Sequence, residues 1–342
     1  MNNYFVLVPI LFPFICSILF NIIKFKNKKS RNVFLISVVV LNFIFTVCLL
    51  LFFHNPEVEL YKINKLLDVY FRIDMLGILF ASIVSFLWIC TLFYSIEYMK
   101  HEGKEEKFFT FFILTLGVTL GIAFSGNLFT MYMFYEFLTL VTFPLVIHEG
   151  SEEALQSGKK YLIYSFFGAT LVLSGVILLY ILGGNFNFVE HGVWNKVLPH
   201  DTELLSYLYI LMFLGFGVKA AIVPLHGWLP SAMIAPTPVS ALLHAVAVVK
   251  SGVFALVRVT YYIFGASIIR EIHATQLLSI LIAITIFMGS MLAFREQNLK
   301  KRLAYSTVSQ LGYVILGVIL LNKPGLTRGF MHLVIDAFIK IT

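Results

Sequence analysis

Eleven long apolar segments follow one another along the 342 residues, separated by short polar stretches. Most are close to the ~20 residues that an α-helix needs to cross ~30 Å of hydrocarbon. The pattern predicts an all-α polytopic membrane protein with about eleven transmembrane helices. The segments lie at residues 4–23, 33–53, 74–96, 108–125, 127–148, 160–183, 205–224, 238–264, 274–294, 304–321 and 327–342.

The composition supports this prediction. Hydrophobic residues make up 59% of the chain and charged residues only 13%, about half of the usual share. A soluble core of this size cannot absorb so much apolar surface, so we expect the lipid bilayer to cover much of it. The net charge of +7 is typical of some nucleic-acid-binding proteins. Here the basic residues cluster in short loops, which indicates membrane topology and no nucleic-acid partner.

The basic residues also predict an orientation. Alternate loops, beginning with KFKNKKSR after the first segment, hold fourteen Lys or Arg, whereas the opposite loops hold six. The positive-inside rule then places the N-terminus outside and the first loop in the cytoplasm. The first segment lacks a basic n-region and a cleavage site, so we expect a membrane helix there, not a signal peptide. The loops favour the plasma (inner) membrane of a prokaryote.

The cysteines exclude several kinds of site. Cys16, Cys48 and Cys90 are isolated in apolar segments, and no CxxC or Cys/His spacing occurs. Iron–sulfur clusters, zinc sites and disulfide frameworks are therefore not expected. We predict no metal, no cofactor and no catalytic centre within the chain. The longest external stretches, 54–73 and 184–204, are too short for a soluble domain.

Residues 217–230, GVKAAIVPLHGWLP, place a cation beside a helix break. Lys219 lies in an apolar segment, and Pro224, Gly227 and Pro230 follow it. Pro224 lacks an N–H, and its ring clashes with the carbonyl four residues earlier, so we expect a broken helix near 219–230. Broken helices line ion sites in many transporters. The alternative is a lysine that snorkels from a helix end.

Three further polar residues lie within apolar segments. Glu136 is near the middle of its segment and is either half of an ion pair on a proton route or a protonated carboxyl bonded to a neighbouring helix. Lys250 lies thirteen residues into segment 238–264, too deep for snorkelling. His244 precedes it by six residues and is often a packing residue in such a position. Arg258, two turns after Lys250, is expected to be an interface anchor.

The last segment carries three polar residues in MHLVIDAFIK. His332, Asp336 and Lys340 are spaced at i, i+4 and i+8 and form one drifting helical stripe. Asp336 and Lys340 are at ion-pair spacing. Desolvation and a nearby carboxylate act in opposite directions on a buried lysine, so moving the counter-charge switches its protonation. A row of such residues can pass protons without a cofactor.

These motifs resemble a known family. GVKAAIVPLHGWLP, APTPVSALLHAVAVVKSGVFALVRV, KRLAYSTVSQLGYVILG and MHLVIDAFIK, with FRIDMLGILF and YSIEYM, are similar to the antiporter-like subunits of respiratory complex I. Relatives include Mrp-type antiporters, energy-converting hydrogenases and formate hydrogenlyases. The resemblance implies about fourteen membrane helices in two inverted repeats. It divides the chain into N-terminal helices (1–105) and a proton-translocating domain (106–342), with a first repeat at about 106–265 and an incomplete second repeat.

The resemblance also implies roles for single residues. Glu136 would be the membrane glutamate, Lys219 its partner, and Lys250 the lysine that leads to the central axis. His244 matches the histidine of SALLHA, and His332 matches the first histidine of an HxxxHA-like pattern. Asp336 stands where a second histidine is expected, which is a departure from the family, and Lys340 matches a frequent lysine.

Three functions follow as hypotheses. The first is a proton- or Na⁺-translocating subunit of a redox-driven complex of NADH dehydrogenase or hydrogenase type, with other membrane subunits as partners. The second is an Mrp-type cation/proton antiporter subunit without electron transfer. The third is a truncated, non-conducting assembly subunit. The last segment ends at Thr342 with no polar loop, so we expect a chain cut from a longer parent.

Overall fold

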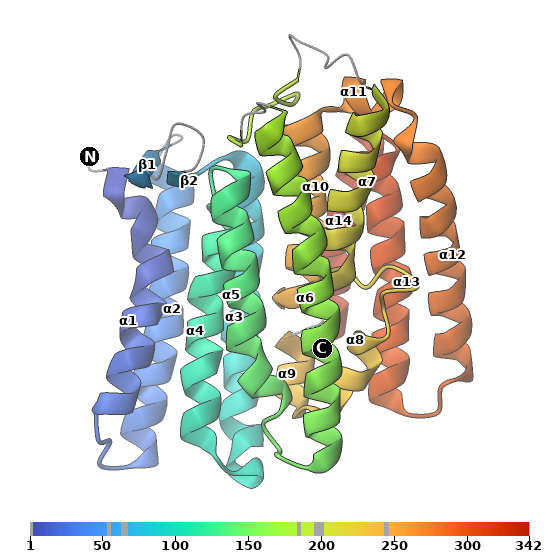
Figure 1. The fold of residues 1–342 in the computed structure, drawn as a ribbon. Helices are drawn as coiled ribbons and strands as arrows, with labels where there is room; N and C mark the ends of the chain where they lie inside the picture. The colour runs from blue at the N-terminus through green and yellow to red at the C-terminus, as the bar shows by residue number, and fades with distance from the viewer. Residues whose placement is uncertain are drawn as a thin grey trace.

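The computed structural model describes residues 3–52, 56–62, 68–182, 186–194, 202–242 and 246–341. Long helices run side by side and form an elongated bundle (Figure 1). The elements are η1 (Asn3–Leu7), α1 (Val8–Ile22), α2 (Lys28–Phe52), β1 (Glu57–Lys62), β2 (Asp68–Arg72), α3 (Met75–Glu102), α4 (Glu105–Ala123), α5 (Leu128–Val146), α6 (Glu152–Ile181), α7 (Thr202–Lys219), α8 (Trp228–Ser231), η2 (Ala232–Ile234), α9 (Thr237–Ala241), α10 (Val248–Arg258), η4 (Val259–Phe264), α11 (Ala266–Glu271), α12 (Ala274–Arg295), α13 (Leu299–Ile319) and α14 (Lys323–Ile341).

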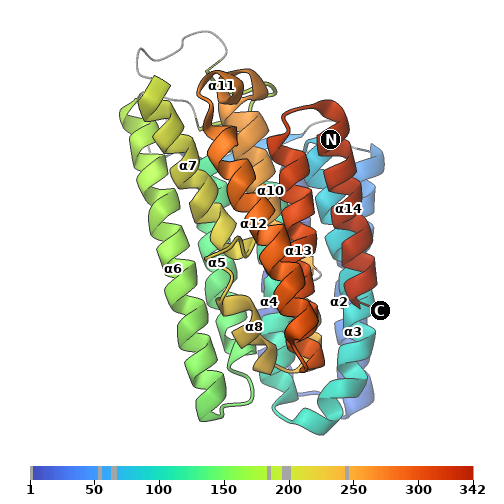
Figure 2. The ribbon, with the colours of Figure 1, turned by 90° about the vertical axis from the view of Figure 1, so that its right-hand side faces the viewer.

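The prediction of an all-α polytopic membrane protein is confirmed. Within the described ranges, eight helices are long and apolar enough to cross a membrane: α1 together with η1, then α2 to α7, and α12. The remaining predicted segments correspond to the divided α9–α10 region and to the more polar α13 and α14. Figure 2 shows α12, α13 and α14 side by side, and α14 also packs against α3.

Polar side chains set where several helices begin. Asp74, Asn127, Ser151 and Asn298 are N-caps whose side-chain oxygens accept hydrogen bonds from backbone N–H groups of the first turn. Each cap satisfies a donor that the helix itself leaves unpaired. The start of each of these helices is therefore determined by residues close to it in the sequence.

The connections gather at two end faces of the bundle. The α1–α2, α3–α4, α5–α6 and α12–α13 loops lie at one end. We call this end the basic face, because the basic residues within 24–31, 100–107, 159–160 and 295–302 lie in these loops or in the helix ends beside them. The β1–β2 hairpin and α11 lie at the other end, called the hairpin face (Figure 1). The separation of the basic loops agrees with the predicted alternation.

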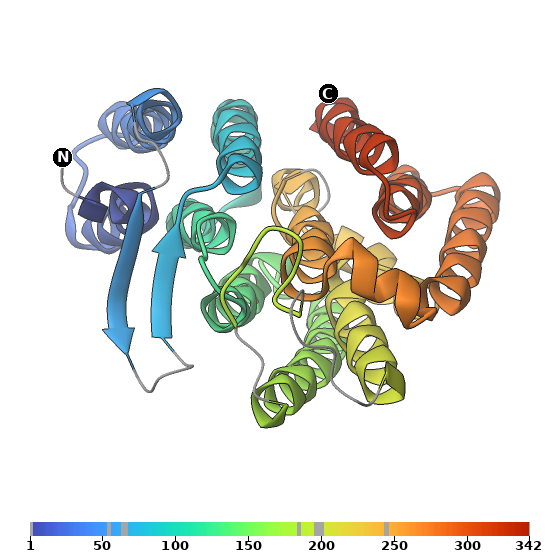
Figure 3. The same ribbon diagram turned by 90° about the horizontal axis from the view of Figure 1, so that it is seen from above.

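The hairpin is an addition to the predicted elements. β1 and β2 pair antiparallel, with Glu57 opposite Arg72. The N–H of Arg72 donates to the carbonyl of Phe124 at 2.9 Å, and the N–H of Gly126 donates to the carbonyl of Tyr70 at 2.9 Å. The hairpin is thus fixed to the α4–α5 connection and lies at the N-terminal side of the bundle (Figure 3).

The prediction of one continuous helix over 238–264 is wrong. The segment divides into α9, α10 and the π-helical turn η4, and residues 243–245, which include His244, lie outside the described residues. The N–H of Ala247 donates to the carbonyl of Leu242, five residues earlier, at 2.8 Å. A bond to the residue five positions earlier has the spacing of a π-helix, which differs from the spacing of four residues in an α-helix. All of α10 is buried, near the centre of the bundle in Figure 3.

Candidate functional site

The predicted helix break is present directly after Lys219. α7 ends at this residue, and Ala221 takes a left-handed conformation with φ of 58°. The carbonyl of Val218 accepts bonds from the N–H of Ala221 at 3.0 Å and from Nε1 of Trp228 at 2.8 Å. The Tyr135 hydroxyl donates to the carbonyl of Phe216 at 3.1 Å. Carbonyls at the helix end are therefore satisfied by side chains of the protein, as a break inside lipid requires.

The break residues predicted from the sequence lie between α7 and α8. Pro224 stands in the irregular stretch, Gly227 is the N-cap of α8, and Pro230 is buried within α8. The N–H of Val223 donates to the Thr285 hydroxyl of α12 at 3.1 Å. The irregular chain is thus connected to a neighbouring helix.

Lys219 lies against the turn of α5 that carries Glu136. Its ammonium group is buried, donates to the carbonyl of Tyr135 and lies 3.4 Å from the centre of the Tyr135 ring. Among the ion pairs of the described residues, none joins Lys219 to Glu136. Oε1 of Glu136 is buried and has no hydrogen-bond partner among the residues that the structure describes. The two predicted partners are therefore neighbours across α5 and α7, with the lysine held by the backbone.

Lys250 and Asp336 form a buried ion pair between α10 and α14. Their side chains are 2% and 4% exposed, and Nζ of Lys250 donates to Oδ2 of Asp336. Asp336 and Lys340 are at ion-pair spacing along α14, but the salt bridge of Asp336 in the described structure is with Lys250. Asp336 faces into the bundle, where a carboxylate needs a cation to offset its lost hydration. Sequence spacing does not show that Lys250 lies opposite.

A close approach connects the break to the Lys250 helix. Gly252 of α10 lies against Lys219 and Ala220, and a Cβ at Gly252 would be 2.6 Å from the N of Ala220. Only glycine allows this contact, since real Cβ atoms do not approach so closely. Lys219 and Lys250 therefore belong to helices in direct contact at this level.

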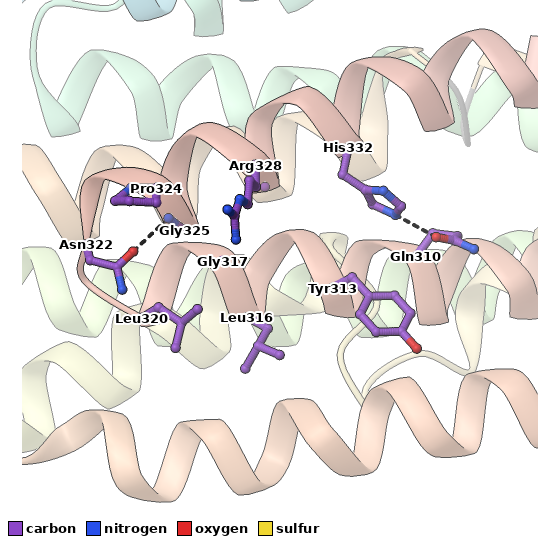
Figure 4. A pocket seen from close by; sticks show the side chains of 11 residues that line it. Gln310, Tyr313, Leu316, Gly317, Leu320, Asn322, Pro324, Gly325, Arg328 and His332 are labelled. Carbon is purple, nitrogen blue, oxygen red and sulfur yellow. Dashed lines mark hydrogen bonds between the residues drawn. The ribbon is translucent and has the colours of Figure 1, made fainter.

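The three polar residues of α14, His332, Asp336 and Lys340, each lie in a different environment. His332 Nε2 is 2.6 Å from Oε1 of Gln310 on α13. Figure 4 shows this pair at the edge of a cavity of about 590 Å³ between α13 and α14, with Arg328 one turn away. Lys340 donates to the Ser306 hydroxyl and lines a separate cavity of about 410 Å³ that Lys300 also lines. Of the three, Asp336 is the one that meets Lys250.

Several polar groups near the site were not singled out from the sequence. In the described structure, three buried polar atoms near the site have no hydrogen-bond partner. They are the hydroxyl of Thr139, one turn after Glu136, the hydroxyl of Ser251, next to Lys250, and Nδ1 of His226 in the break. Buried polar atoms of this kind are usually hydrated in proteins. The signal available was weak, because single Ser and Thr residues are common in membrane helices.

Arg258 is a buried residue, and its prediction as an interface anchor is wrong. Its guanidinium donates to both carboxylate oxygens of Asp74, with Nη2 2.7 Å from Oδ1. Its side chain is 1% exposed and lies among the rings of Phe188, Phe254 and Tyr262. Burial alone would raise the pKa of Asp74, but the adjacent Arg258 holds that pKa below its usual value.

The described residues contain no group of three or more His, Cys, Asp or Glu side chains that could hold a metal ion. The candidate site therefore consists of single acids and bases: Glu136, Lys219, Lys250 and Asp336, with His332 and Lys340 on the far helix. Such groups can bind and release protons.

Curated relatives carry two kinds of name. The chain is 31% identical over 317 residues to Na(+)/H(+) antiporter subunit A1 of Staphylococcus aureus, which covers 91% of this chain and 38% of that protein. It is 32% identical over 282 residues to NAD(P)H-quinone oxidoreductase subunit 5, organellar chromatophore 1, of Paulinella chromatophora, covering 80% and 41%. The chain thus spans about two fifths of the length of these relatives.

Solved structures share the fold. One is a chain of the archaeal membrane-bound sulfane sulfur reductase, with a TM-score of 0.82 and 22% identity, covering 99% of this chain and 68% of that chain. Another is a chain of the Mrp complex from Dietzia sp. DQ12-45-1b, with a TM-score of 0.84 and 22% identity, covering 99% and 62%.

Two family models account for most of the chain. Residues 64–109 match the model described as NADH-Ubiquinone oxidoreductase (complex I), chain 5 N-terminus. Residues 125–342 match the model described as NADH:quinone oxidoreductase/Mrp antiporter, TM. This second match covers the helix break and the Lys250–Asp336 pair, and the chain belongs to the NADH:quinone oxidoreductase/Mrp antiporter transmembrane family.

Proposed function

We propose that the chain is a membrane subunit that moves protons, or exchanges Na⁺ for protons, through its buried acids and bases. The observation that carries this proposal is the buried Lys250–Asp336 pair. Ionisable residues inside membrane segments are costly and rare, and those that occur usually mark ion or proton pathways. The break after Lys219 supports it, since broken helices are where transporters bind ions.

In the proposed route, a proton enters near the break, where Glu136 and Lys219 are neighbours. Hydration of the unpartnered Glu136, Thr139 and His226 atoms would supply the path. The charge on Lys219 then acts on Lys250 through the contact at Gly252. Asp336 releases or holds the Lys250 proton, and His332 and Lys340 continue the route on α14. His244 is proposed to belong to the same route.

The subunit is proposed to work with other membrane subunits, as the Mrp complex and the sulfane sulfur reductase are both multisubunit assemblies by name. We propose the plasma membrane of a prokaryote as its location, with the hairpin face and N-terminus outside. The Lys-rich loops at the opposite face support that orientation. The residues are proposed to divide into an N-terminal part (1–105) and a translocating part (106–342).

The test is ion transport by the protein in its complex, reconstituted into vesicles with a pH-sensitive dye inside. Glu136→Gln and Lys219→Ala should each abolish proton movement, because each removes a group that binds the proton. Lys159→Ala is the matched control, since it removes an exposed cation from the basic face. Normal proton movement in both site variants would contradict the route.

The driving force separates the two leading functions. An antiporter moves protons in response to a Na⁺ gradient without an electron donor, whereas a redox-driven subunit needs electron transfer in the complex. Relatives with both names match the chain at similar identity. Absence of proton movement under either driving force, in an assembled complex, would favour the non-conducting assembly subunit.

A further inference from the structure

Lys250 is the first of three residues on one stripe of α10. Phe254 and Arg258 follow at i+4 and i+8, so the three side chains lie one above another over about 12 Å toward the hairpin face. Each of the three side chains contacts a partner outside α10. Asp336 pairs with Lys250, Phe80 of α3 stacks on Phe254, and Asp74 pairs with Arg258.

The middle layer is apolar. The rings of Phe80 and Phe254 are 4.6 Å apart at an interplanar angle of 20°, and each residue is 1% exposed. Neither side chain offers a hydrogen-bonding atom. A proton or hydrated cation that crosses this layer would have to lose its water without any replacement ligand, which is strongly unfavourable in a low-dielectric interior.

The outer layer carries positive charge. Arg258 donates to both oxygens of Asp74, and Arg72 lies 3.8 Å from the same carboxylate. Arg72 also donates to the carbonyl of Phe188 at 2.8 Å, and the Phe188 ring lies 5.1 Å from Arg258. Two guanidinium groups thus face one carboxylate, and a fixed cation of this kind opposes the passage of other cations.

The backbone at Asp74 is shaped for this cation. Asp74 caps α3 by accepting from the N–H of Gly77 at 2.8 Å. A Cβ at Gly77 would be 2.5 Å from the carbonyl of Ala123 and 3.1 Å from Nη2 of Arg258. Glycine at this position gives the guanidinium room to reach both carboxylate oxygens.

We propose that the Phe80–Phe254 pair and the Arg258–Asp74 pair close the Lys250 site toward the hairpin face. A charge that reaches Lys250 then leaves sideways to Asp336 and α14, and is not lost directly through the end of the bundle. This closure rests on the proposed transport function and adds to it the element that prevents leak.

The first experiment measures passive proton conductance of the reconstituted complex, with no electron donor and no Na⁺ gradient. Phe254→Ala opens the apolar layer and should raise the conductance about tenfold above wild type. Leu256→Ala is the control, because Leu256 is equally buried on α10 but off the stripe. Equal conductance of the two variants and wild type would overturn the closure.

The second experiment does not depend on transport. Ser251→Cys, next to Lys250, is made in a chain whose Cys16, Cys48 and Cys90 are replaced by Ser. A membrane-impermeant anionic thiol reagent, which the guanidinium groups of Arg258 and Arg72 do not repel, is applied at the hairpin face. The thiol should be unreactive alone and with Leu256→Ala, and should react when Phe254→Ala is added. Labelling that is unchanged by Phe254→Ala would contradict the proposal.

The two experiments separate the possible failures. Absence of transport in wild type, with labelling opened by Phe254→Ala, would reject the proposed function and retain the closure. Normal transport in wild type, with no added leak and no added labelling in Phe254→Ala, would reject the closure alone. Thermal unfolding of each variant in detergent is the control for folding: a cooperative transition like that of wild type shows that the fold is intact.

Discussion

Lys250 of α10 and Asp336 of α14 are 86 positions apart in the sequence and form an ion pair whose side chains are at most 4% exposed. The pair joins the central helix to the helix at the edge of the bundle. Removing either charge leaves the other buried and unpaired, which typically costs about 3–5 kcal/mol.

Asp336→Asn and Lys250→Met should therefore each lower the free energy of unfolding by about 3 kcal/mol or more. The double variant Lys250→Met/Asp336→Leu should lose less than the sum, because no isolated charge remains. Thermal unfolding in detergent measures the three changes. Additive losses would show that the pair does not hold the two helices together.

Gly252→Ala should destabilise the protein, because its Cβ would be 2.6 Å from the N of Ala220 and 2.9 Å from the carbonyl carbon of Lys219. Overpacking of this kind costs about 1–3 kcal/mol. Ser251→Ala is the neighbouring control and should be close to neutral, since the Ser251 hydroxyl has no partner to lose in the described structure. Equal melting temperatures for the two variants would contradict the close contact.

Tyr135→Phe should reduce stability and leave transport largely intact. It removes the bond from the Tyr135 hydroxyl to the carbonyl of Phe216, worth about 0.5–1.5 kcal/mol. It keeps the backbone carbonyl and the ring that hold Lys219. Transport rate and melting are measured on the same preparation. Loss of transport as complete as in Glu136→Gln would mean that the hydroxyl itself carries the proton.

The Asp74–Arg258 pair should make stability depend on pH. The pKa of Asp74 is below its usual value in the folded protein, because Arg258, the N–H of Gly77 and Arg72 together outweigh the effect of burial. The stabilisation is therefore complete above the ordinary carboxyl pKa and is lost as the pH falls through the lowered value. The difference in melting temperature between wild type and Asp74→Asn should be constant near neutral pH and shrink in acid. A difference that grows on acidification would have the wrong sign.

The helix break and the helical class could be predicted from short stretches of sequence. Pro224 and Gly227 are local signals against a helix, and most of the apolar segments are close to the ~20 residues that a membrane-crossing helix needs. The division of segment 238–264 was missed, because no proline or glycine stands in the sequence between α9 and α10.

The partners of the charged residues could not be predicted in the same way. Spacing along α14 suggested Lys340 as the partner of Asp336, and position near a segment end suggested the membrane interface for Arg258. In the structure, Asp336 pairs with Lys250, and Arg258 pairs with Asp74. The sequence by itself determined which segments are helical, where one breaks and which buried positions carry charge, because these follow from local hydrophobicity and backbone chemistry. Only the tertiary structure decided which charges meet, because a buried ion is satisfied by whichever group the packing of distant helices brings within a few ångströms.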